Sequence, residues 1–356
     1  MREGFVRKSI NEICDKASSN IAQNKIKGMN GDYPVYGASG YVQNIDFYHR
    51  DADYIGIVKD GSGVGRVNVY PAYSSLLGTM QYIIPKDGYL LGYVAYALKG
   101  LNLSSFASGA AIPHIYFKDY GKCKIDVPPL AEQERIVAEL DLLSSIIDKK
   151  KAQLKELDQL AQSIFYTMFG DPITNEKGWE VKKLRKVSTL INGRAYKQNE
   201  LLNEGKYKVL RVGNFFTNSN YYYSDLELEE NKYCDNGDLL FAWSASFGAF
   251  IWDGEKVIYH YHIWKVLYDE KQLNKIFYCN LLNTMTNAFM NDVHGIGMVH
   301  LTKQGMEDYI LPLPPLSLQQ EFAEKVEAIE RQKALVQQSI AETQTLFDSR
   351  MDHWFS

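Results

Sequence analysis

The longest regular pattern of hydrophobic and polar positions lies in two segments of the chain, residues 130–170 and 316–356. In both, apolar residues recur at alternating spacings of four and three, the heptad pattern of a helix that packs against another helix. The apolar positions are Ile136, Leu140, Leu143, Ile147, Leu154 and Leu157 in the first segment and Phe322, Val326, Ile329, Val336, Ile340 and Phe347 in the second. A helix of about 39 residues is roughly 58 Å long.

Both helices are expected to begin after the same tripeptide. Pro128-Pro129-Leu130 recurs 186 residues later as Pro314-Pro315-Leu316, and Gln133 recurs as Gln319. Adjacent prolines can precede a helix but would break its interior. The heptad positions share the offset of 186, so the two helices have one register and each is the simplest partner for the other.

The relation between the helices leaves two possibilities. In the first, each amphipathic helix packs on its own domain and on nothing else, which is the simpler arrangement for a single helix. Two helices with a shared register can instead pair with each other, and the intervening sequence is too long for a tight turn between them. We predict an antiparallel pair, which would place one domain at each end of the rod.

The sequence before each helix, residues 1–129 and 171–315, predicts a mixed, mostly β domain. Short β-branched and aromatic runs bounded by Gly, Pro and Asp predict strands at residues 54–58, 66–70, 80–84, 238–242 and 258–267. Helices are expected near residues 88–99 and 274–287. The predicted fold class is α+β, with two mixed, mostly β domains separated by two long antiparallel coiled-coil helices.

The two domains are also copies of each other, but their offset drifts. Tyr33 matches Tyr207 at an offset of 174, whereas Gly63 matches Gly248 at an offset of 185. Both ends of the unit match, so the second domain has gained residues internally. The gain is predicted around positions 214–237.

Composition limits the class of protein. A chain of 356 residues with 46% hydrophobic residues is long enough for two folded domains. The four cysteines form no Cys-x-x-Cys pair, so neither a zinc ribbon nor a disulfide framework is expected. No apolar run approaches the ~18 residues that cross a bilayer, and we expect a soluble, cytoplasmic chain.

Charge is distributed unevenly along the chain. The net charge of −4 does not by itself suggest a nucleic-acid partner, but ten basic residues against three glutamates lie between Lys177 and Arg211. A weakly acidic total can hide a basic face of this kind. Tyrosine and asparagine side chains interleave with the basic ones, and this mix is suited to phosphates and base edges.

Two groups of residues resemble catalytic motifs. Asp60–Gly65 has the glycine spacing of a nucleotide-binding loop, but the alternating segment after it ends in Pro71. This favours a turn between two strands, where small residues permit close approach to a ligand such as DNA. Asp171, Glu180 and Lys182 mimic a nuclease motif, although charge in a linker explains them better.

A metal site and a catalytic site are both disfavoured. His260 and His262 could share one face of a strand, but no third ligand has suitable spacing, so a structural or DNA-facing role is favoured over a metal. The chain has no Walker loop, no helicase motif and no Asn-Pro-Pro-aromatic motif for methylation of base amino groups. We predict a chain without a catalytic site and without a bound metal.

The residues expected to contact DNA are basic, polar or aromatic and lie in predicted turns. They are Lys25, Lys27, Tyr36, Ser39, Lys59, Ser62 and Arg66 in the first domain and Arg194, Lys197, Arg211, Asn214, Trp243, Ser244 and Ser246 in the second. For any single lysine among them, an ordinary solvated surface is the alternative. The heptad positions given above are expected to form the coiled coil and the partner-binding helices.

The order and duplication of the motifs resemble the specificity (S) subunit of type I restriction–modification systems. The fragments that carry the resemblance are YPVYGASGYV (33–42), KDGSGVGRV (59–67), GAAIPHIYF (109–117), VPPLAEQERI (127–136), GWEVKKL (178–184) and LPPLSLQQEF (313–322). The resemblance extends over essentially the whole chain. Leu318 departs from the pattern, because it replaces the usual acid of the second Pro-Pro-Leu-x-Glu-Gln.

The resemblance implies a division of labour within a complex. Each domain would read one half of a bipartite double-stranded DNA site, and the helix pair would set the spacing and dock two methyltransferase subunits, through which restriction/translocase subunits join. S-adenosylmethionine, ATP and Mg are expected on those partners, with no cofactor in this chain, in a prokaryotic, nucleoid-associated setting. The alternatives are the specificity subunit of a fused methyltransferase–nuclease (type II) system, and a coiled-coil scaffold that does not bind DNA.

Overall fold

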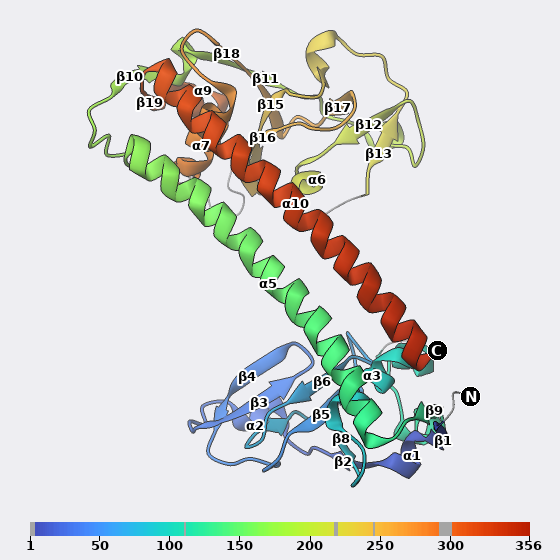
Figure 1. Ribbon diagram of the computed structural model, residues 1–356. Helices are drawn as coiled ribbons and strands as arrows, with labels where there is room; N and C mark the ends of the chain where they lie inside the picture. Colours follow the sequence, from blue (N-terminus) through green and yellow to red (C-terminus); the bar gives the residue numbers. More distant parts are fainter. Residues whose placement is uncertain (1–3, 110–111, 217–219, 245, 292–300) are drawn as a thin grey trace. The chain divides into compact units, whose positions relative to one another are not determined.

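The computed structural model describes residues 4–109, 112–216, 220–244, 246–291 and 301–356 (Figure 1). The chain divides into two compact units. The first contains residues 1–152 and 337–356, and the second contains residues 153–336. Each long helix contributes one segment to each unit, so the two units do not coincide with the four segments expected from the sequence. The boundaries of those four segments remain a prediction.

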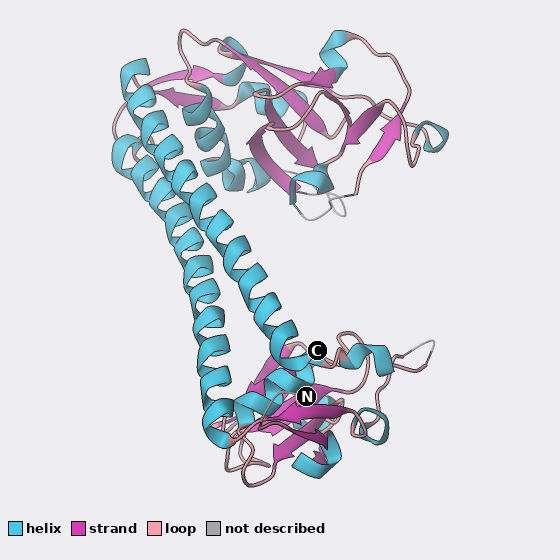
Figure 2. Cartoon of the chain, turned by 45° about the vertical axis from the view of Figure 1, so that its right-hand side comes forward, coloured by secondary structure: helices cyan, strands magenta, loops and turns pink. Residues whose placement is uncertain are grey.

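The two long helices are α5 (Leu130–Phe169) and α10 (Leu316–Phe355), each of 40 residues (Figure 2). Both predicted helices are therefore confirmed to within one residue at either end. The backbone N–H of Gln133 donates to the carbonyl O of Pro129 at 3.0 Å, so the proline pair supplies the first acceptor of α5. Gly170 follows α5 with a φ of +73°, the left-handed conformation that commonly ends a helix.

The first unit is built on three sheets. Its strands are β1 (Val6–Ser9), β2 (Cys14–Ser18), β3 (Tyr33–Gly37), β4 (Gly40–Ile45), β5 (Tyr54–Val58), β6 (Val67–Tyr70), β7 (Ser75–Leu76), β8 (Met80–Pro85) and β9 (Lys124–Val127), and its short helices are α1 (Ile10–Ile13), α2 (Gln23–Ile26), α3 (Leu91–Gly100) and α4 (Phe117–Tyr120). The sheet orders are β2-β8-β5-β6, β4-β3-β7 and β1-β9. Strands β3 and β7 run parallel.

The second unit repeats this plan. Its strands are β10 (Glu180–Lys183), β11 (Ser188–Asn192), β12 (Tyr207–Leu210), β13 (Tyr222–Ser224), β14 (Tyr233–Cys234), β15 (Leu239–Ser244), β16 (Ser246–Ile251), β17 (Val257–Tyr259), β18 (Ile263–Tyr268) and β19 (Ile310–Leu313), and its short helices are α6 (Val212–Phe216), α7 (Lys275–Thr284), α8 (Thr286–Asn291) and α9 (Lys303–Asp308). The sheet orders are β11-β18-β15-β16, β13-β12-β17-β14 and β10-β19. Strands β12 and β17 run parallel, like β3 and β7.

The predicted gain of residues in the second domain is confirmed. Ala38 and Ser39 alone connect β3 to β4, whereas residues 211–221 connect the corresponding strands β12 and β13. Strand β14 is a further addition, because no strand of the first unit corresponds to it among the described residues. The two copies therefore share their sheets and differ mainly in the connections around β12 and β13.

One predicted strand is wrong. Residues 258–267 form two strands, β17 and β18, and these belong to different sheets. The backbone N–H of Ile263 donates to the carbonyl O of His260 at 3.0 Å, which closes a tight turn between them. Periodicity alone does not mark this break, because β-branched and aromatic residues fill both strands and the chain changes sheets without a glycine or proline.

The core of the first unit includes both long helices. Ile136 and Leu140 of α5 are fully buried there together with Tyr93 of α3. Trp354 of α10 is 8% exposed and belongs to the same cluster, and the ring of Phe355 lies 5.4 Å from that of Tyr93. The start of one long helix and the end of the other therefore complete this domain.

The core of the second unit has the same arrangement. Phe322 at the start of α10 and Phe165 and Phe169 at the end of α5 belong to one buried cluster with Phe277 of α7. The Phe169 ring lies 4.7 Å from Phe277 and 5.3 Å from Phe322. Removing one buried ring of this kind lowers the free energy of unfolding by about 3–5 kcal/mol. The helix end that each domain receives from the other copy therefore contributes substantially to its stability.

The paired segments run antiparallel within each unit. In the first, Glu139 contacts Arg350 and the Lys150 Nζ donates to the Ser339 Oγ at 2.7 Å, so the numbers rise along α5 and fall along α10. In the second, the Lys333 Nζ lies 2.8 Å from a carboxylate oxygen of Asp158. Of the twelve heptad residues, seven are buried and five are half-buried. The alternative, in which each long helix packs only on its own domain, therefore applies to the first turns of each helix and not to the rest.

A buried glutamine ties each long helix to the short helix of its own domain. Gln133 is 1% exposed. Its Oε1 accepts from the backbone N–H of Leu90, the residue before α3, at 2.9 Å, and its Nε2 donates to the carbonyl O of Pro128 at 3.0 Å. One amide thus satisfies a free N–H at a helix start and a carbonyl of the proline pair.

Gln319 makes the same contacts in the second unit. Its Oε1 accepts from the backbone N–H of Asn274, the residue before α7, at 2.8 Å, and its Nε2 donates to the carbonyl O of Pro314 at 2.8 Å. The repeat of Pro-Pro-Leu-x-x-Gln in the sequence therefore has a structural cause. The glutamine fixes the direction in which the long helix leaves its domain.

Replacing Gln319 with leucine should lower the free energy of unfolding of the second unit by about 2–4 kcal/mol, because the Asn274 N–H and the Pro314 carbonyl lose their partners. Urea unfolding followed by tryptophan fluorescence would measure this, since four of the five tryptophans lie in that unit. Gln320→Leu is the matched control, because Gln320 is exposed. Equal losses in the two variants would contradict the role of Gln319.

Candidate nucleic-acid interface

The glycine-rich segment of the first unit is a turn between two strands, as predicted. Strands β5 and β6 pair antiparallel, with Ile57 opposite Val67, and residues 59–66 connect them. Gly61, Gly63 and Gly65 adopt φ values of +80°, +86° and +86°. These left-handed conformations suit glycine and hold the turn in a compact form without a helix behind it.

Three other segments gather around this turn. The Arg66 Nη1 donates to the carbonyl O of Ala38 in the β3–β4 turn at 3.1 Å. The backbone N–H of Lys59 donates to the carbonyl O of Thr79 at 3.0 Å, and that of Gly61 donates to Pro113 at 2.9 Å. The predicted residues Ser39, Lys59, Ser62 and Arg66 are therefore brought to one end of the domain.

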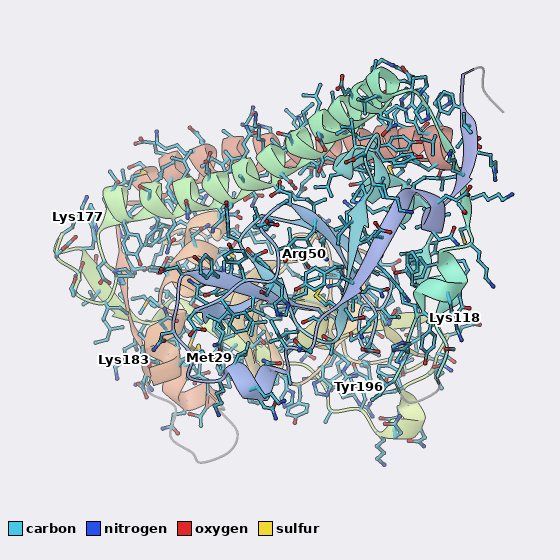
Figure 3. The ribbon with its side chains drawn as sticks, turned by 90° about the horizontal axis from the view of Figure 1, so that it is seen from below. Met29, Arg50, Lys118, Lys177, Lys183 and Tyr196 are labelled. Atoms are coloured by element: carbon cyan, nitrogen blue, oxygen red, sulfur yellow. The ribbon has the colours of Figure 1, made fainter. Side chains whose placement is uncertain are left out.

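The remaining predicted residues of the first unit lie nearby or are partly covered. Lys25 and Lys27 are exposed, on and just after α2, and they take part in no ion pair among the described residues. Tyr36 is half-buried, and its ring lies 4.8 Å from that of Tyr70. Arg50, labelled in Figure 3, lies with its guanidinium 5.2 Å from the ring of Tyr82.

A groove of about 700 Å³ adjoins the glycine-rich turn, lined by residues 20–23, 37–39, 41, 42 and 77–79. These segments come from β2 to α2, from the β3–β4 hairpin and from the turn before β8. Of the residues expected to contact DNA, only Ser39 lines it. Sequence patterns did not mark the other residues that line the groove, because three short segments far apart in the chain form it together.

In the second unit the corresponding hairpin joins β15 to β16. Its predicted residue Ser244 is buried, with 5% of its surface exposed. The Trp243 ring stacks on Trp264 at 5.4 Å, and its Nε1 donates to the carbonyl O of Tyr261 at 2.9 Å. Ser246 is half-buried. Strand alternation is a poor guide to exposure here, because the hairpin packs on both of its faces.

Most of the predicted basic block is paired inside the second unit. The ion pairs are Lys182 with Glu180, Lys183 and Arg185 with Asp308, Arg194 with Glu200, Lys206 with Glu227, and Lys208 with Glu255. Lys177, in the turn after α5, donates from its Nζ to the carbonyl O of Met168 at 3.2 Å and so caps the end of that helix (Figure 3). Most of the positive charge of the block is therefore paired with carboxylates of the same unit, and little of it is left as a free cationic face.

The predicted DNA contacts in this block divide accordingly. Two nitrogens of Arg194 donate to the two carboxylate oxygens of Glu200 at 2.9 and 2.8 Å, and this fork lowers the pKa of Glu200 to about 2. Lys197 and Arg211 form no ion pair in the described part of the chain and are exposed. The Asn214 Oδ1 accepts from the backbone N–H of Arg211 at 2.8 Å, so Asn214 shapes the connection after β12.

The nuclease-like residues do not converge. A carboxylate oxygen of Asp171 accepts from the backbone N–H of Ile173 at 2.8 Å in the turn after α5, whereas Glu180 lies on β10 and is 3.2 Å from Lys182. Each residue therefore has a local structural partner. Charge in the linker and first strand accounts for all three.

The two histidines lie within the connection between β17 and β18, residues 260–262, with ring centroids 4.8 Å apart. They do not share a strand face as expected, because both lie where the predicted strand is interrupted. Burial, followed by the neighbouring His262 and Arg211, lowers the pKa of His260 to about 4. Among the residues that the structure describes, no group of three or more His, Cys, Asp or Glu side chains is placed to hold a metal ion.

Two α+β domains of one topology, each leading into a long helix of the same register, define a modular α+β protein built by duplication. A family model described as "Type I restriction modification DNA specificity domain" matches residues 2–159 and 176–344. The chain belongs to this family.

Relatives with curated functions are type I specificity subunits. The EcoBI specificity subunit of Escherichia coli is 27% identical over 153 residues, covering 42% of this chain and 32% of the relative. The MjaIX specificity subunit of Methanocaldococcus jannaschii is 24% identical over 278 residues, covering 69% and 64%. The chain thus spans about a third of the first relative and just under two thirds of the second.

Solved structures share the fold. The type I S subunit from M. genitalium aligns with a TM-score of 0.60 at 13% identity, covering 99% of this chain and 96% of its own. A chain from a solved type I R-M system aligns with a TM-score of 0.60 at 16% identity, covering 99% and 98%. Within the residues described, no helix combines the length and apolar character needed to cross a membrane.

Lowering the pH from about 6.5 to about 4 should reduce the free energy of unfolding of the second unit. The unfolded chain protonates His260 near its ordinary pKa of about 6.5, but the folded chain does so only near 4. Urea unfolding at a series of pH values would show a smaller decrease in His260→Gln than in the wild type. Identical pH slopes in the two proteins would contradict the buried, neutral state of His260.

Proposed function

We propose that the chain is the DNA sequence-specificity subunit of a type I restriction–modification complex. Each domain reads one half of a bipartite target, and the helix pair sets the spacing between the halves. The observation that carries the proposal is the duplication of one sheet plan with divergent connections. Two half-sites of different sequence require two different readers on a common frame.

Partner docking is proposed on the outer faces of the long helices. Four leucines there are strongly exposed, namely Leu142 at 61%, Leu160 at 47%, Leu335 at 59% and Leu346 at 50%. Leu160 and Leu346 occupy equivalent positions 186 residues apart. Equivalent apolar positions on two copies of one helix fit two copies of one partner, which we propose are methyltransferase subunits.

The chemistry belongs to these partners. S-adenosylmethionine would serve the methyltransferase subunits, and ATP with Mg would serve restriction/translocase subunits that join through them. The contribution of this chain is the choice of DNA sequence. The residues placed around the glycine-rich turn, together with Lys25 and Lys27, are proposed to hold DNA in the first domain, and Lys197 and Arg211 in the second.

Exchanging residues 1–129 for the corresponding domain of another specificity subunit should change one half of the methylated motif and keep the other half. Long-read methylation sequencing of cells that express the chimera with its methyltransferase partner measures this. The unaltered chain with the same partner is the control, and the unaltered chain alone should methylate nothing. A change in both halves would contradict modular reading. Absence of any methylated motif with the partner present would favour a scaffold that does not bind DNA.

The lysines proposed to contact phosphates should control the salt dependence of binding. For the complex on a 40-bp duplex carrying the methylated motif, Lys25→Ala with Lys27→Ala should reduce the slope of log K against log[salt] by about 0.9 per lost contact. Lys206→Ala is the matched control, because Lys206 is paired with Glu227. A larger effect of the control than of the double variant would contradict this placement of the DNA.

A further inference from the structure

The groove beside the glycine-rich turn combines an apolar floor with a polar rim. Ile21 and Leu77 are each 6% exposed and form the floor together with the half-buried Val42. Asn20 and Gln23 lie on the rim and are exposed. The groove is open to solvent along this rim, so a ligand can enter it without rearrangement of the sheets.

The rim side chains keep their hydrogen-bonding groups available. Among the described residues, Asn20, Gln23, Ser39 and Thr79 form no side-chain hydrogen bond, and all four are exposed. The neighbouring Gln43 differs, because its Nε2 donates to a backbone carbonyl at 2.6 Å and holds α2 in place. Two amides and two hydroxyls are therefore left to bind a ligand rather than to support the fold.

Basic side chains border the groove on two sides. Arg66 reaches its wall, since its Nη1 donates to the carbonyl O of Ala38 at 3.1 Å. Lys59 adjoins Thr79 through its backbone N–H at 3.0 Å. On the other side, Lys25 follows the rim residue Gln23 on α2 and is exposed. This distribution suits a ligand that carries negative charge at its edges and a less polar surface between them.

We propose that this groove receives the major-groove edge of an A·T pair in the half-site that the first domain reads. Asn and Gln amides are suited to bidentate contact with adenine N6 and N7, and an apolar surface suits the thymine methyl group. The bordering cations would lie against the phosphates on either side. Asn20 and Gln23 are then specificity-determining residues. This inference rests on the proposed function and adds the base pair that the first domain prefers.

The test is selection of bound duplexes from a randomised 40-bp library by the full chain in complex with its methyltransferase partner. The wild type, Asn20→Ala with Gln23→Ala, and Asn24→Ala are compared. Asn24 is the matched control, because it is an exposed amide on α2 that does not line the groove. The double variant should lose preference for A·T over G·C at one or two positions of one half-site, by roughly 5- to 100-fold.

The other half-site serves as the internal standard. It should be selected equally by all three proteins, which shows that the variants are folded and that the second domain still reads its sequence. An unchanged motif in the double variant, or an equal loss in Asn24→Ala, would overturn the assignment of the groove while leaving the proposed function standing. Failure of the wild type to select any bipartite motif would instead contradict the proposed function itself.

Discussion

The structure depends on the insertion of the end of each long helix into the core of the domain that belongs to the other copy of the duplicated unit. Phe165 and Phe169 of α5 are buried against α7 of the second unit, and Trp354 and Phe355 of α10 pack on α3 of the first. Apolar burial of this size is worth several kcal/mol per side chain. The helices are therefore parts of both domain cores rather than linkers between finished domains.

This constraint explains which parts of the duplicated unit have stayed alike. A helix that must fit two cores at once cannot change its register without disturbing both, so the heptads and the Pro-Pro-Leu-x-x-Gln segment keep one offset. Gln133 and Gln319 add a directional requirement, because each joins a long helix to the start of a short one. Among the residues that the structure describes, the connections around β12 and β13 contribute no residue to the two helix-end cores, and they have diverged.

The sequence predicted the long helices, the duplication and most strands, because heptads and repeated tripeptides are local signals that packing does not override. It did not predict that His260 lies in a turn, since strand signals continue on both sides of that residue. It also overestimated the free positive charge of the second domain. Pairs such as Arg194 with Glu200 depend on local folding, and a count of charges does not reveal them.

The most direct test of this account is hydrogen exchange of the full chain and of a chain that ends at Gln344, which removes the end of α10. Loss of Phe347, Trp354 and Phe355 from the first core should greatly reduce amide protection in α3, while protection in α7 of the second unit stays unchanged. Undiminished protection of α3 in the shortened chain would contradict the claim that each domain is completed by the end of the other copy's helix.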